Sequence, residues 1–234
     1  MKHLKRCYTE LLTNTPDPVI AIEQAGRLCY KSQKHCTECD GSGWRDVEIE
    51  AGKFEKQSCM DCNGRATEFV RMLIKRGHEA MIEHAVATFK FICDRGVTHE
   101  LVRHRLASYA QESTRYCNYS KDKFDSEITV IRPPELTEQQ WERRKKVLEH
   151  IELLYQEEVG EGVKPQIARG VLPISLKTEI ICTANFRQWR TMMKLRTSKA
   201  AHPQIRQMMS SVHNVFKMEW PVFVEDIEPY EHTD

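Results

Sequence analysis

The chain has 234 residues, of which 40% are apolar and 29% are charged, and its 35 lysines and arginines nearly balance its 34 aspartates and glutamates. The formal charge of +1 argues against a broadly basic nucleic-acid-binding protein. The composition is that of a globular chain with its own core, and no apolar run reaches the roughly 18 to 20 residues that span a bilayer. Residues 1–6 lack an apolar signal core, so we expect a cytoplasmic protein with no membrane partner.

Helical and extended patterns alternate along the first half of the chain. A proline-rich turn and helical spacing of apolar residues predict a helix within 15–30, and similar spacing predicts a second helix ending at Gly77. Alternating apolar residues over 85–91 predict a strand with one buried face. A third helical run is expected from Val97 to about Ser108, with the cationic residues that precede Ser108 on its last turns.

The second half continues this irregular mixture. A strand is expected over 127–132, and Thr137 with Gln140 forms a capping box for a long helix. Residues 179–183 predict a further strand, and helices are expected over 185–196 and from about Pro203 to Pro221. Strands and helices in this order predict the α+β class, with a mixed or antiparallel sheet packed with helices in a single domain covering 1–234.

The nine cysteines include two C-x-x-C pairs with the same C-x-x-C-x-G pattern, and these pairs lie in a segment poor in apolar residues. The pairs are Cys36 with Cys39 and Cys59 with Cys62. Two thiolates at this spacing can hold one tetrahedral ion, so we expect a structural zinc ion in an inserted zinc-ribbon-like subdomain over 33–65. A redox-active dithiol is the alternative. The first pair, with Gly41 and Gly43, resembles the repeat of DnaJ-type chaperones. The remaining five cysteines are expected to be buried or half-buried small hydrophobic residues: Cys7, Cys29, Cys93, Cys117 and Cys182.

Three arginines and a histidine lie within thirteen residues over 103–115, flanked by hydroxyl and amide side chains. Arginine grips oxyanions with two parallel hydrogen bonds, and hydroxyl and amide groups can read the edge of a base. The cluster therefore suits a phosphorylated ligand with a planar base. A salt-bridged surface helix is the alternative, and the residues alone do not decide between them.

Several segments in order along the chain carry a resemblance to one enzyme family. Arg103-His104-Arg105, seven residues and then Ser113 form the most specific motif, preceded by a Gly-His-Glu-Ala-Met-Ile-Glu-His segment over 77–84. Segments 168–173, 185–187, 195–196 and 205–206 follow in the expected order. Outside the insertion, nearly the whole chain resembles the flavin-dependent thymidylate synthases.

The resemblance implies an enzyme that makes dTMP from dUMP, with the one-carbon unit from 5,10-methylenetetrahydrofolate and the hydride from FAD reduced by NADPH. It implies dUMP contacts from Glu100, Arg103, Gln111, Glu112, Ser113, Thr114, Arg115, Arg169 and Arg196. It implies FAD contacts from His84, Val86, Arg103, His104, Arg105, Gln111, Asn185, Arg187 and Thr191. It also implies a homotetramer with active sites shared between subunits.

Arg196 is the residue to which we assign catalysis, because a fixed cation beside the N3/O4 edge of uracil would stabilise the negative charge that develops when carbon 5 attacks. Ser113 is interpreted as a ligand-positioning residue and not as a nucleophile. Other functions left open are a zinc-ribbon module that binds nucleic acid and an inactive relative that keeps the fold.

The motifs depart from the family pattern at a few positions. Ala80 replaces a common Ser, Thr191 replaces Asn or His, and His202 and Gln204 replace the Gln and Glu of many relatives. Glu100 stands where the family often has Gln. The three cationic clusters are nevertheless complete, so the predicted reaction stays the same.

Overall fold

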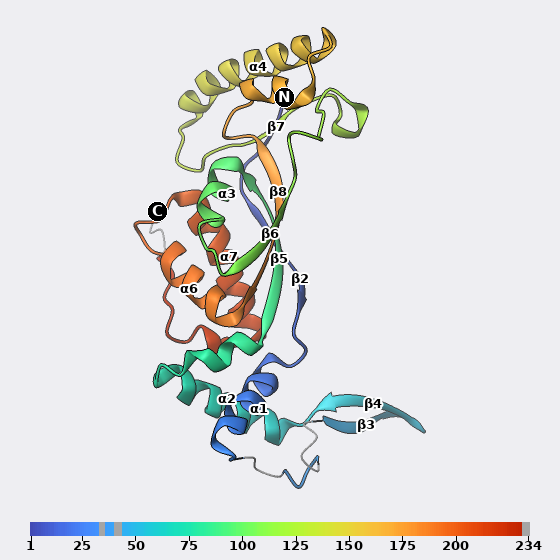
Figure 1. The fold of residues 1–234 in the computed structure, drawn as a ribbon, viewed down its shortest axis with the longest axis vertical. Coiled ribbons are helices and arrows are strands. Elements are labelled where there is room, and N and C mark those ends of the chain that lie inside the picture. Colours follow the sequence, from blue (N-terminus) through green and yellow to red (C-terminus); the bar gives the residue numbers. More distant parts are fainter. Residues whose placement is uncertain (33–35, 40–43, 231–234) are drawn as a thin grey trace.

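The structure is a computed structural model, and it describes residues 1–32, 36–39 and 44–230. Its centre is a four-stranded antiparallel sheet in the order β2-β5-β8-β6 (Figure 1). The strands span Tyr8–Asn14 (β2), Val86–Asp94 (β5), Lys177–Asn185 (β8) and Ala107–Gln111 (β6). The two central strands confirm the predicted strands over 85–91 and 179–183, and the mixture with helices confirms the α+β class. The two outer strands were missed, because they lack a strict apolar alternation.

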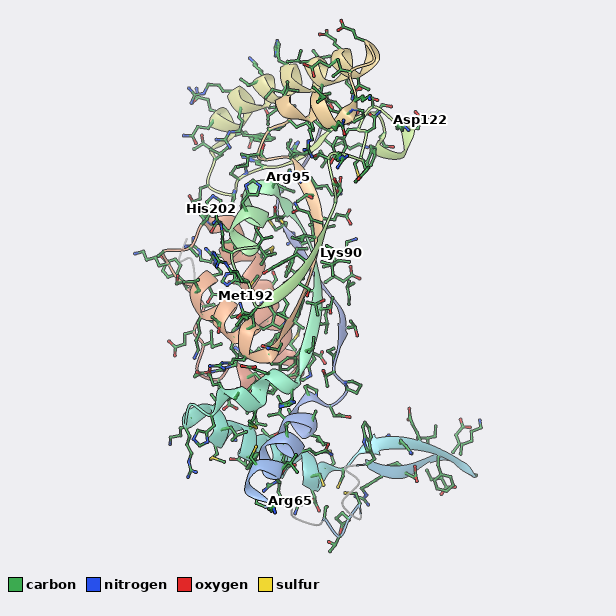
Figure 2. The ribbon with its side chains drawn as sticks, in the orientation of Figure 1. Arg65, Lys90, Arg95, Asp122, Met192 and His202 are labelled. Atoms are coloured by element: carbon green, nitrogen blue, oxygen red, sulfur yellow. The ribbon has the colours of Figure 1, made fainter. Side chains whose placement is uncertain are left out.

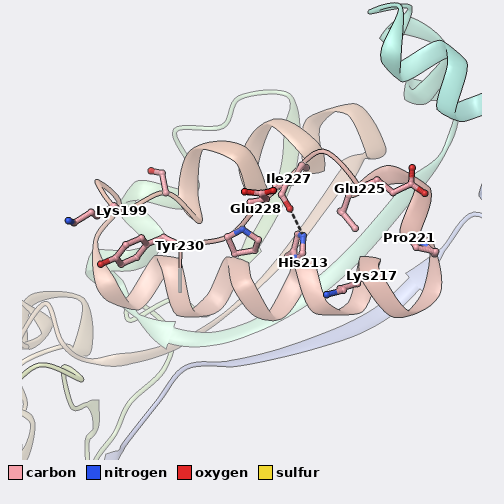
Figure 3. Close-up of a pocket in the computed structure, with 11 residues that line it drawn as sticks. Lys199, His213, Lys217, Pro221, Glu225, Ile227, Glu228 and Tyr230 are labelled. Carbon is pink, nitrogen blue, oxygen red and sulfur yellow. Dashed lines mark hydrogen bonds between the residues drawn. The ribbon is translucent and has the colours of Figure 1, made fainter. Parts of the chain in front are cut away.

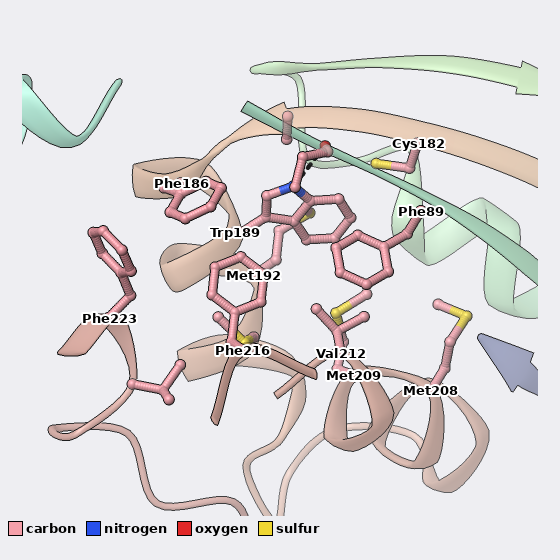
Figure 4. Close-up of a cluster of buried hydrophobic side chains, with 14 of the residues drawn as sticks. Phe89, Cys182, Phe186, Trp189, Met192, Met208, Met209, Val212, Phe216 and Phe223 are labelled. Atoms are coloured by element: carbon pink, nitrogen blue, oxygen red, sulfur yellow. Dashed lines mark hydrogen bonds between the residues drawn. The ribbon is translucent and has the colours of Figure 1, made fainter. Parts of the chain in front are cut away.

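One face of the sheet is covered by helices, and the core lies between them. The covering helices are α3 (Arg95–Leu101), α6 (Phe186–Arg196) and α7 (Pro203–Glu219) (Figure 1). Phe89 from β5 packs edge-on against Trp189 of α6, with 4.9 Å between ring centroids, and Phe216 of α7 lies beside them (Figure 4). The indole nitrogen of Trp189 donates to the carbonyl of Ala87 at 3.0 Å, so its one polar group is satisfied inside the core.

The opposite face of the sheet is partly polar and carries no covering helix in Figure 1. Lys90 points away from the helices, whereas Met192 points into the core (Figure 2). Lys90 pairs with Glu179 of the neighbouring strand at 2.6 Å, and Val86 and Ile181 on the same face are 38% and 37% exposed. Alternation of side chains along a strand therefore divides this sheet into a core face and an accessible face.

One end of the molecule is formed by α1 (Pro18–Tyr30), α2 (Met60–Lys75) and a 3-10 helix, η1 (Glu79–His84). A Cβ added at Gly26 of α1 would lie 2.7 Å from the ring of Phe69, so glycine allows the close approach of α1 to α2. Both helices confirm the sequence prediction, and α2 ends before Gly77, which has φ +71°. The second helix begins earlier than expected: its first turn, which carries Cys62, lies inside the insertion predicted over 33–65.

The other end holds a second, smaller core. The short strand β1 (Lys2–Leu4) pairs in parallel with β7 (Thr129–Ile131), which confirms the strand predicted over 127–132. The long helix α4 (Glu138–Gly160) begins with the predicted capping box, and its Trp141, Leu148 and Tyr155 are buried. The remaining short helices are η2 (Asp122–Phe124), α5 (Pro165–Ala168), η3 (Arg169–Val171) and η4 (Pro221–Phe223).

The predicted insertion forms a hairpin that extends from the α1–α2 end (Figure 1). Its strands are β3 (Trp44–Glu50) and β4 (Lys53–Ser58), and every residue of β3 is exposed. Residues 33–35 at the start of the insertion lie outside the described residues, and so do Gly41 and Gly43 after the first C-x-x-C pair. The division into a main domain and a subdomain over 33–65 stays a prediction.

The third helix was predicted too long. It ends at Leu101, so Arg103, His104 and Arg105 lie in the connection to β6 and not on a helix. The hydroxyl of Tyr109 lies 2.9 Å from the carbonyl oxygen of Leu101 and 2.8 Å from that of His104, so its single O–H is shared between two backbone acceptors just after the helix. Pairing of β6 with the edge of β8 then replaces the helical hydrogen bonds that sequence spacing had suggested.

Three of the five scattered cysteines, Cys7, Cys93 and Cys182, are buried, and Cys117 is partly buried. The prediction was wrong for Cys29, which is exposed near the end of α1. Among the described helices, none combines the length and the apolar character needed to cross a membrane.

Candidate active site

Arg196 is the centre of a three-residue cluster between α3 and α6. It is the last residue of α6, and its Nη1 donates to the Glu100 carboxylate at 2.8 Å. Its Nη2 donates to the Glu100 carbonyl at 3.2 Å, and its Nε donates to His104 Nε2 at 3.0 Å. The side chains of Arg196 and Glu100 are 17% and 34% exposed, so the cluster is partly accessible to solvent.

His104 is held almost out of solvent, with 8% exposure. Burial, and secondarily the adjacent Arg196 cation, lower the pKa of His104 below its ordinary value. The imidazole is therefore neutral near pH 7. The structure thus brings three of the predicted site residues into direct contact although 92 residues separate His104 from Arg196.

The end of β6 orders the next predicted residues. Gln111 donates from Nε2 to the hydroxyls of Thr98 at 3.0 Å and Thr178 at 3.3 Å. The Glu112 carboxylate accepts from the hydroxyl of Tyr119 at 2.7 Å and lies 3.4 Å from Lys177 Nζ. Glu112 is therefore held by the scaffold through its side chain.

The loop after β6 carries a second cationic group. Arg169 Nη1 donates to the hydroxyl of the buried Thr114 at 3.4 Å, and Arg115 Nε donates to Gln166 Oε1 at 3.2 Å. The hydroxyl oxygen of Ser113 accepts from the backbone N–H of Arg115 at 3.3 Å. Two exposed guanidinium groups are thus presented from one loop and one short helix, an arrangement suited to an oxyanion.

The predicted flavin residues gather where β5 begins and β8 ends. Val86 lies opposite Asn185 in the strand register, and Asn185 caps α6 by accepting from Gln188 N at 2.8 Å. Arg187 Nη1 donates to Glu83 at 2.6 Å, next to the exposed His84 at the end of η1. The hydroxyl of Thr191 is used within α6, where it donates to the Arg187 carbonyl at 3.1 Å.

The strand register separates the predicted residues into two ends. Ala107 at the start of β6 pairs with Ala184, and Gln111 at its end pairs with Ile180. The exposed Arg103 and Arg105 precede this strand, on the side of Asn185, whereas the loop with Arg115 follows it. Within one chain, the predicted flavin end and the predicted phosphate end thus lie at opposite ends of β6.

The four predicted metal ligands come together. The sulfurs of Cys36, Cys39, Cys59 and Cys62 all lie within 4.8 Å of one another. Cys39 Sγ is 3.4 Å from Cys62 Sγ, and Cys36 Sγ is 3.9 Å from Cys59 Sγ. A tetrahedral ion with metal–sulfur bonds of about 2.3 Å requires sulfurs about 3.8 Å apart. The donor set and its spacing therefore fit such an ion.

Arg196 lines neither of two cavities in the described part of the chain. The larger, about 810 Å³, lies between α7 and the segment after η4, and His213 on its wall bonds the carbonyl of Ile227 (Figure 3). The smaller, about 100 Å³, is lined by Glu112, Tyr119 and Lys177 among others. The larger cavity contains none of the predicted site residues.

Sequence reasoning missed the residues that hold the site in place. Thr98 and Thr178, which fix Gln111, lie 13 and 67 residues from it, and Gln166 lies 51 residues from Arg115. These are ordinary polar residues outside any motif. No spacing signal could have identified them, because their partners are set by the tertiary fold.

The model of the family described as thymidylate synthase complementing protein matches residues 10–222. A flavin-dependent thymidylate synthase of Geobacter sulfurreducens is 32% identical over 94% of this chain and 86% of its own length. The Thermococcus onnurineus enzyme of the same name is 35% identical over 85% of this chain and 74% of its own.

Another relative of the same name, from Pyrococcus furiosus, is 37% identical, but the match covers 56% of this chain and 54% of that protein. The chain thus spans about half the length of this relative. Among solved structures, a UMP/dUMP methylase, PolB from Streptomyces cacaoi, has a TM-score of 0.71 at 20% identity, with 96% of both chains covered. This likeness concerns the fold.

Proposed function

This chain belongs to the thymidylate synthase complementing protein family, and from that premise we propose that it is a flavin-dependent thymidylate synthase that converts dUMP to dTMP. The one-carbon unit would come from 5,10-methylenetetrahydrofolate, and NADPH would be the reductant. The observation that carries the proposal is the assembly of Glu100, His104 and Arg196, which are scattered in sequence, into one hydrogen-bonded cluster.

Arg196 fits the role of activating the uracil ring. The N3/O4 edge of uracil gains negative charge when carbon 5 becomes nucleophilic, and a fixed guanidinium beside that edge stabilises the charge. The side chain is anchored on one edge by Glu100 and His104, so it cannot swing away as the charge develops. The chain's contribution to this step is alignment and electrostatics.

The second cationic group suits the nucleotide's phosphate. Arg115 and Arg169 are exposed, and each is steadied by a neutral partner, Gln166 and Thr114. Their charges are thus free for an anion. Ser113 interacts with the Arg115 backbone, which supports a positioning role and not that of a nucleophile.

The residues at the other end of the sheet fit a flavin nucleotide. Arg103 and Arg105 present exposed cations for the pyrophosphate of a flavin nucleotide. Val86 offers an exposed apolar side chain, and His84 an exposed imidazole, against which the flavin ring could lie. When bound, FAD supplies the hydride that completes the methyl group. The protein residues would orient it and exclude water.

The active enzyme is proposed to be a homotetramer. The flavin residues and the phosphate-binding arginines lie at opposite ends of β6, so a second chain beside the first would bring complementary ends together. The uncovered sheet face, with Val86 and Ile181 more than a third exposed, offers a surface for such contact. Light scattering coupled to gel filtration tests this, and a monomer that makes dTMP would contradict it.

The four-cysteine cluster is proposed to hold zinc. Four thiolates leave no open coordination position, so the ion would be structural. Metal analysis of the purified protein should find about one zinc per chain. Replacement by cobalt should give the absorption of a tetrahedral thiolate site, and its absence would favour a dithiol pair.

The first test of the proposed reaction is anaerobic. FAD and NADPH are added to the pure protein, and bleaching of the flavin absorption band is followed with and without dUMP. We expect dUMP to change the bleaching clearly, because nucleotide and flavin would share one site. A protein that binds no flavin under either condition would contradict the proposed function and leave the zinc-binding insertion as the functional part.

Folate-dependent turnover completes the test. Adding 5,10-methylenetetrahydrofolate to the reduced protein with dUMP should yield dTMP, measured by chromatography. Retention on a polynucleotide column that falls with salt would instead support the nucleic-acid-binding alternative. The cytoplasmic location expected from the sequence stays a prediction.

A further inference from the structure

Resting on the proposed function, we propose that Glu100 is a positioning residue. It fixes the guanidinium of Arg196, and through Arg196 it holds His104 as a neutral imidazole whose proton is on Nδ1. Glu100 thereby decides which hydrogen-bond donors face the ligand.

The hydrogen bonds of Arg196 show how its orientation is set. An arginine side chain has five N–H groups in a planar fork and no acceptor. Three of them are directed at Glu100 and His104: one from Nη1, one from Nη2 and the one on Nε. Two N–H groups remain, one on each Nη, in the same plane as the three that are used. These are the donors available to a ligand.

The contact with Arg196 also determines the protonation of His104. Arginine always donates, so Nε2 of His104 must accept, and an accepting nitrogen carries no proton. The proton of the neutral ring is therefore on Nδ1. The low pKa of His104, which arises from burial and from the Arg196 cation, agrees with a neutral ring.

Glu100 is the anchor of this chain of contacts, because it binds Arg196 through both its carboxylate and its backbone carbonyl. It lies on the last turn of α3, whose Val97 and Leu101 are buried. The preceding turn of α6 is equally fixed, since Met192 and Met193 are buried in the same core. Two rigid helices thus hold the two ends of the ion pair.

Removal of the Glu100 carboxylate would release one edge of Arg196. The backbone carbonyl and His104 would then be its remaining partners, and neither of them carries a negative charge. Arg196 would be held less firmly by these two neutral acceptors, so the hydrogen bond that keeps Nε2 of His104 unprotonated would be weakened. The two remaining N–H groups of Arg196, which are the donors available to a ligand, would then be displaced.

The direct test reads the tautomer of His104 without turnover. The intact protein is labelled with ¹⁵N-histidine, and the His104 signals are assigned by their loss in His104→Asn. Wild type should show a protonated Nδ1 and an unprotonated Nε2 at pH 7.5. Glu100→Gln keeps an oxygen acceptor and should retain this pattern, whereas Glu100→Ala should shift it toward the Nε2-protonated form.

Kinetics of the FAD-loaded enzyme separate positioning from direct binding. Glu100→Ala should lower kcat at least tenfold while the Kd for dUMP, measured by calorimetry, changes less than threefold. Glu100→Gln should lower kcat less than Glu100→Ala does, because it keeps an oxygen acceptor for Nη1 of Arg196. The matched control is Glu23→Gln, which removes the carboxylate of another partly buried pair, with Arg27 at 2.6 Å, and should leave both quantities unchanged.

Two results would overturn the proposal. An unchanged His104 tautomer in a folded Glu100→Ala protein would show that Glu100 does not control it. A tenfold weaker dUMP affinity with an unchanged kcat would show that Glu100 is a ligand contact. If wild type makes no dTMP, the proposed function fails, but the tautomer measurement still decides the role of Glu100.

Discussion

Metal removal is the perturbation whose outcome follows most directly from the structure. Every residue of β3 is exposed, and the buried side chains at the base of the hairpin are the thiols of Cys36, Cys39 and Cys59. Ordering each residue costs about 1 to 2 kcal/mol of backbone entropy, and an isolated two-stranded hairpin is marginal in water. A structural zinc ion contributes about 10 to 16 kcal/mol in small modules. We therefore expect the hairpin to depend on the proposed zinc ion for its fold.

The remaining fold has its own core and should survive. Ile22 of α1 and Val70 and Leu73 of α2 are fully buried in the main cluster, whereas the buried thiols form a separate cluster. Chelation should therefore unfold the segment within 33–65 and leave the sheet intact.

Hydrogen–deuterium exchange before and after chelation measures this directly. Amides of residues 44–58 should exchange at the rate of an unstructured peptide once metal loss has been verified, and amides of 86–94 should keep their protection. Restoring zinc should restore protection of 44–58. Unchanged protection of the hairpin in metal-free protein would refute the reasoning, and so would loss of protection in β5.

Four further outcomes are expected. Arg196→Ala should lower kcat for dTMP formation about 100- to 1000-fold, while the amount of bound flavin, measured by absorbance, stays nearly unchanged. Near-normal turnover of this variant would show that Arg196 does not activate the uracil ring. Asp226→Asn should cost about 1 to 2 kcal/mol in urea unfolding at pH 7, because the carboxylate forms two hydrogen bonds with the buried Arg190. Hydrogen bonds from Arg190, and secondarily from Lys194, hold the pKa of Asp226 well below its ordinary value. The stabilisation of the fold by the Asp226 carboxylate is therefore present at neutral pH and is lost as the pH falls below about 4. If the difference in unfolding free energy between wild type and Asp226→Asn were as large at pH 2 as at pH 7, this reasoning would be contradicted. Phe216→Ala, which empties a ring site with no exposure, should cost about 3 to 5 kcal/mol in the same assay, and a cost below about 1 kcal/mol would mean that the cavity had collapsed. Thr137→Ala should cost about 1 kcal/mol by removing the cap of α4, with Thr137→Ser as the control that keeps the hydroxyl.

Local chemistry explains why many elements could be predicted from the sequence. The capping box at Thr137, the N-cap at Asn185 and the apolar alternation over 85–91 each depend on residues close together in the chain. The grouping of the four cysteines could also be predicted, because two C-x-x-C pairs of the same pattern are typical of a four-thiolate metal site. The reaction was predicted from the resemblance of the Arg-His-Arg and serine motif, and of the segments around it, to the flavin-dependent thymidylate synthases, whereas the residue types alone suggested only an anionic ligand.

Only the tertiary structure decided where the third helix ends and which of the predicted site residues are in contact. The third helix ends at Leu101, the Tyr109 hydroxyl lies against the carbonyls of Leu101 and His104, and β6 pairs with β8. Neither contact is visible in the local pattern. Arg196, Glu100 and His104 meet across 92 to 96 residues, so their hydrogen bonds, and with them the tautomer of the histidine, exist only in the folded chain. Sequence by itself determined which residues are candidates for the chemistry and which local elements form, because those depend on side-chain type and short-range spacing. The fold determined which of these residues touch, because contacts between distant segments depend on how helices and strands pack.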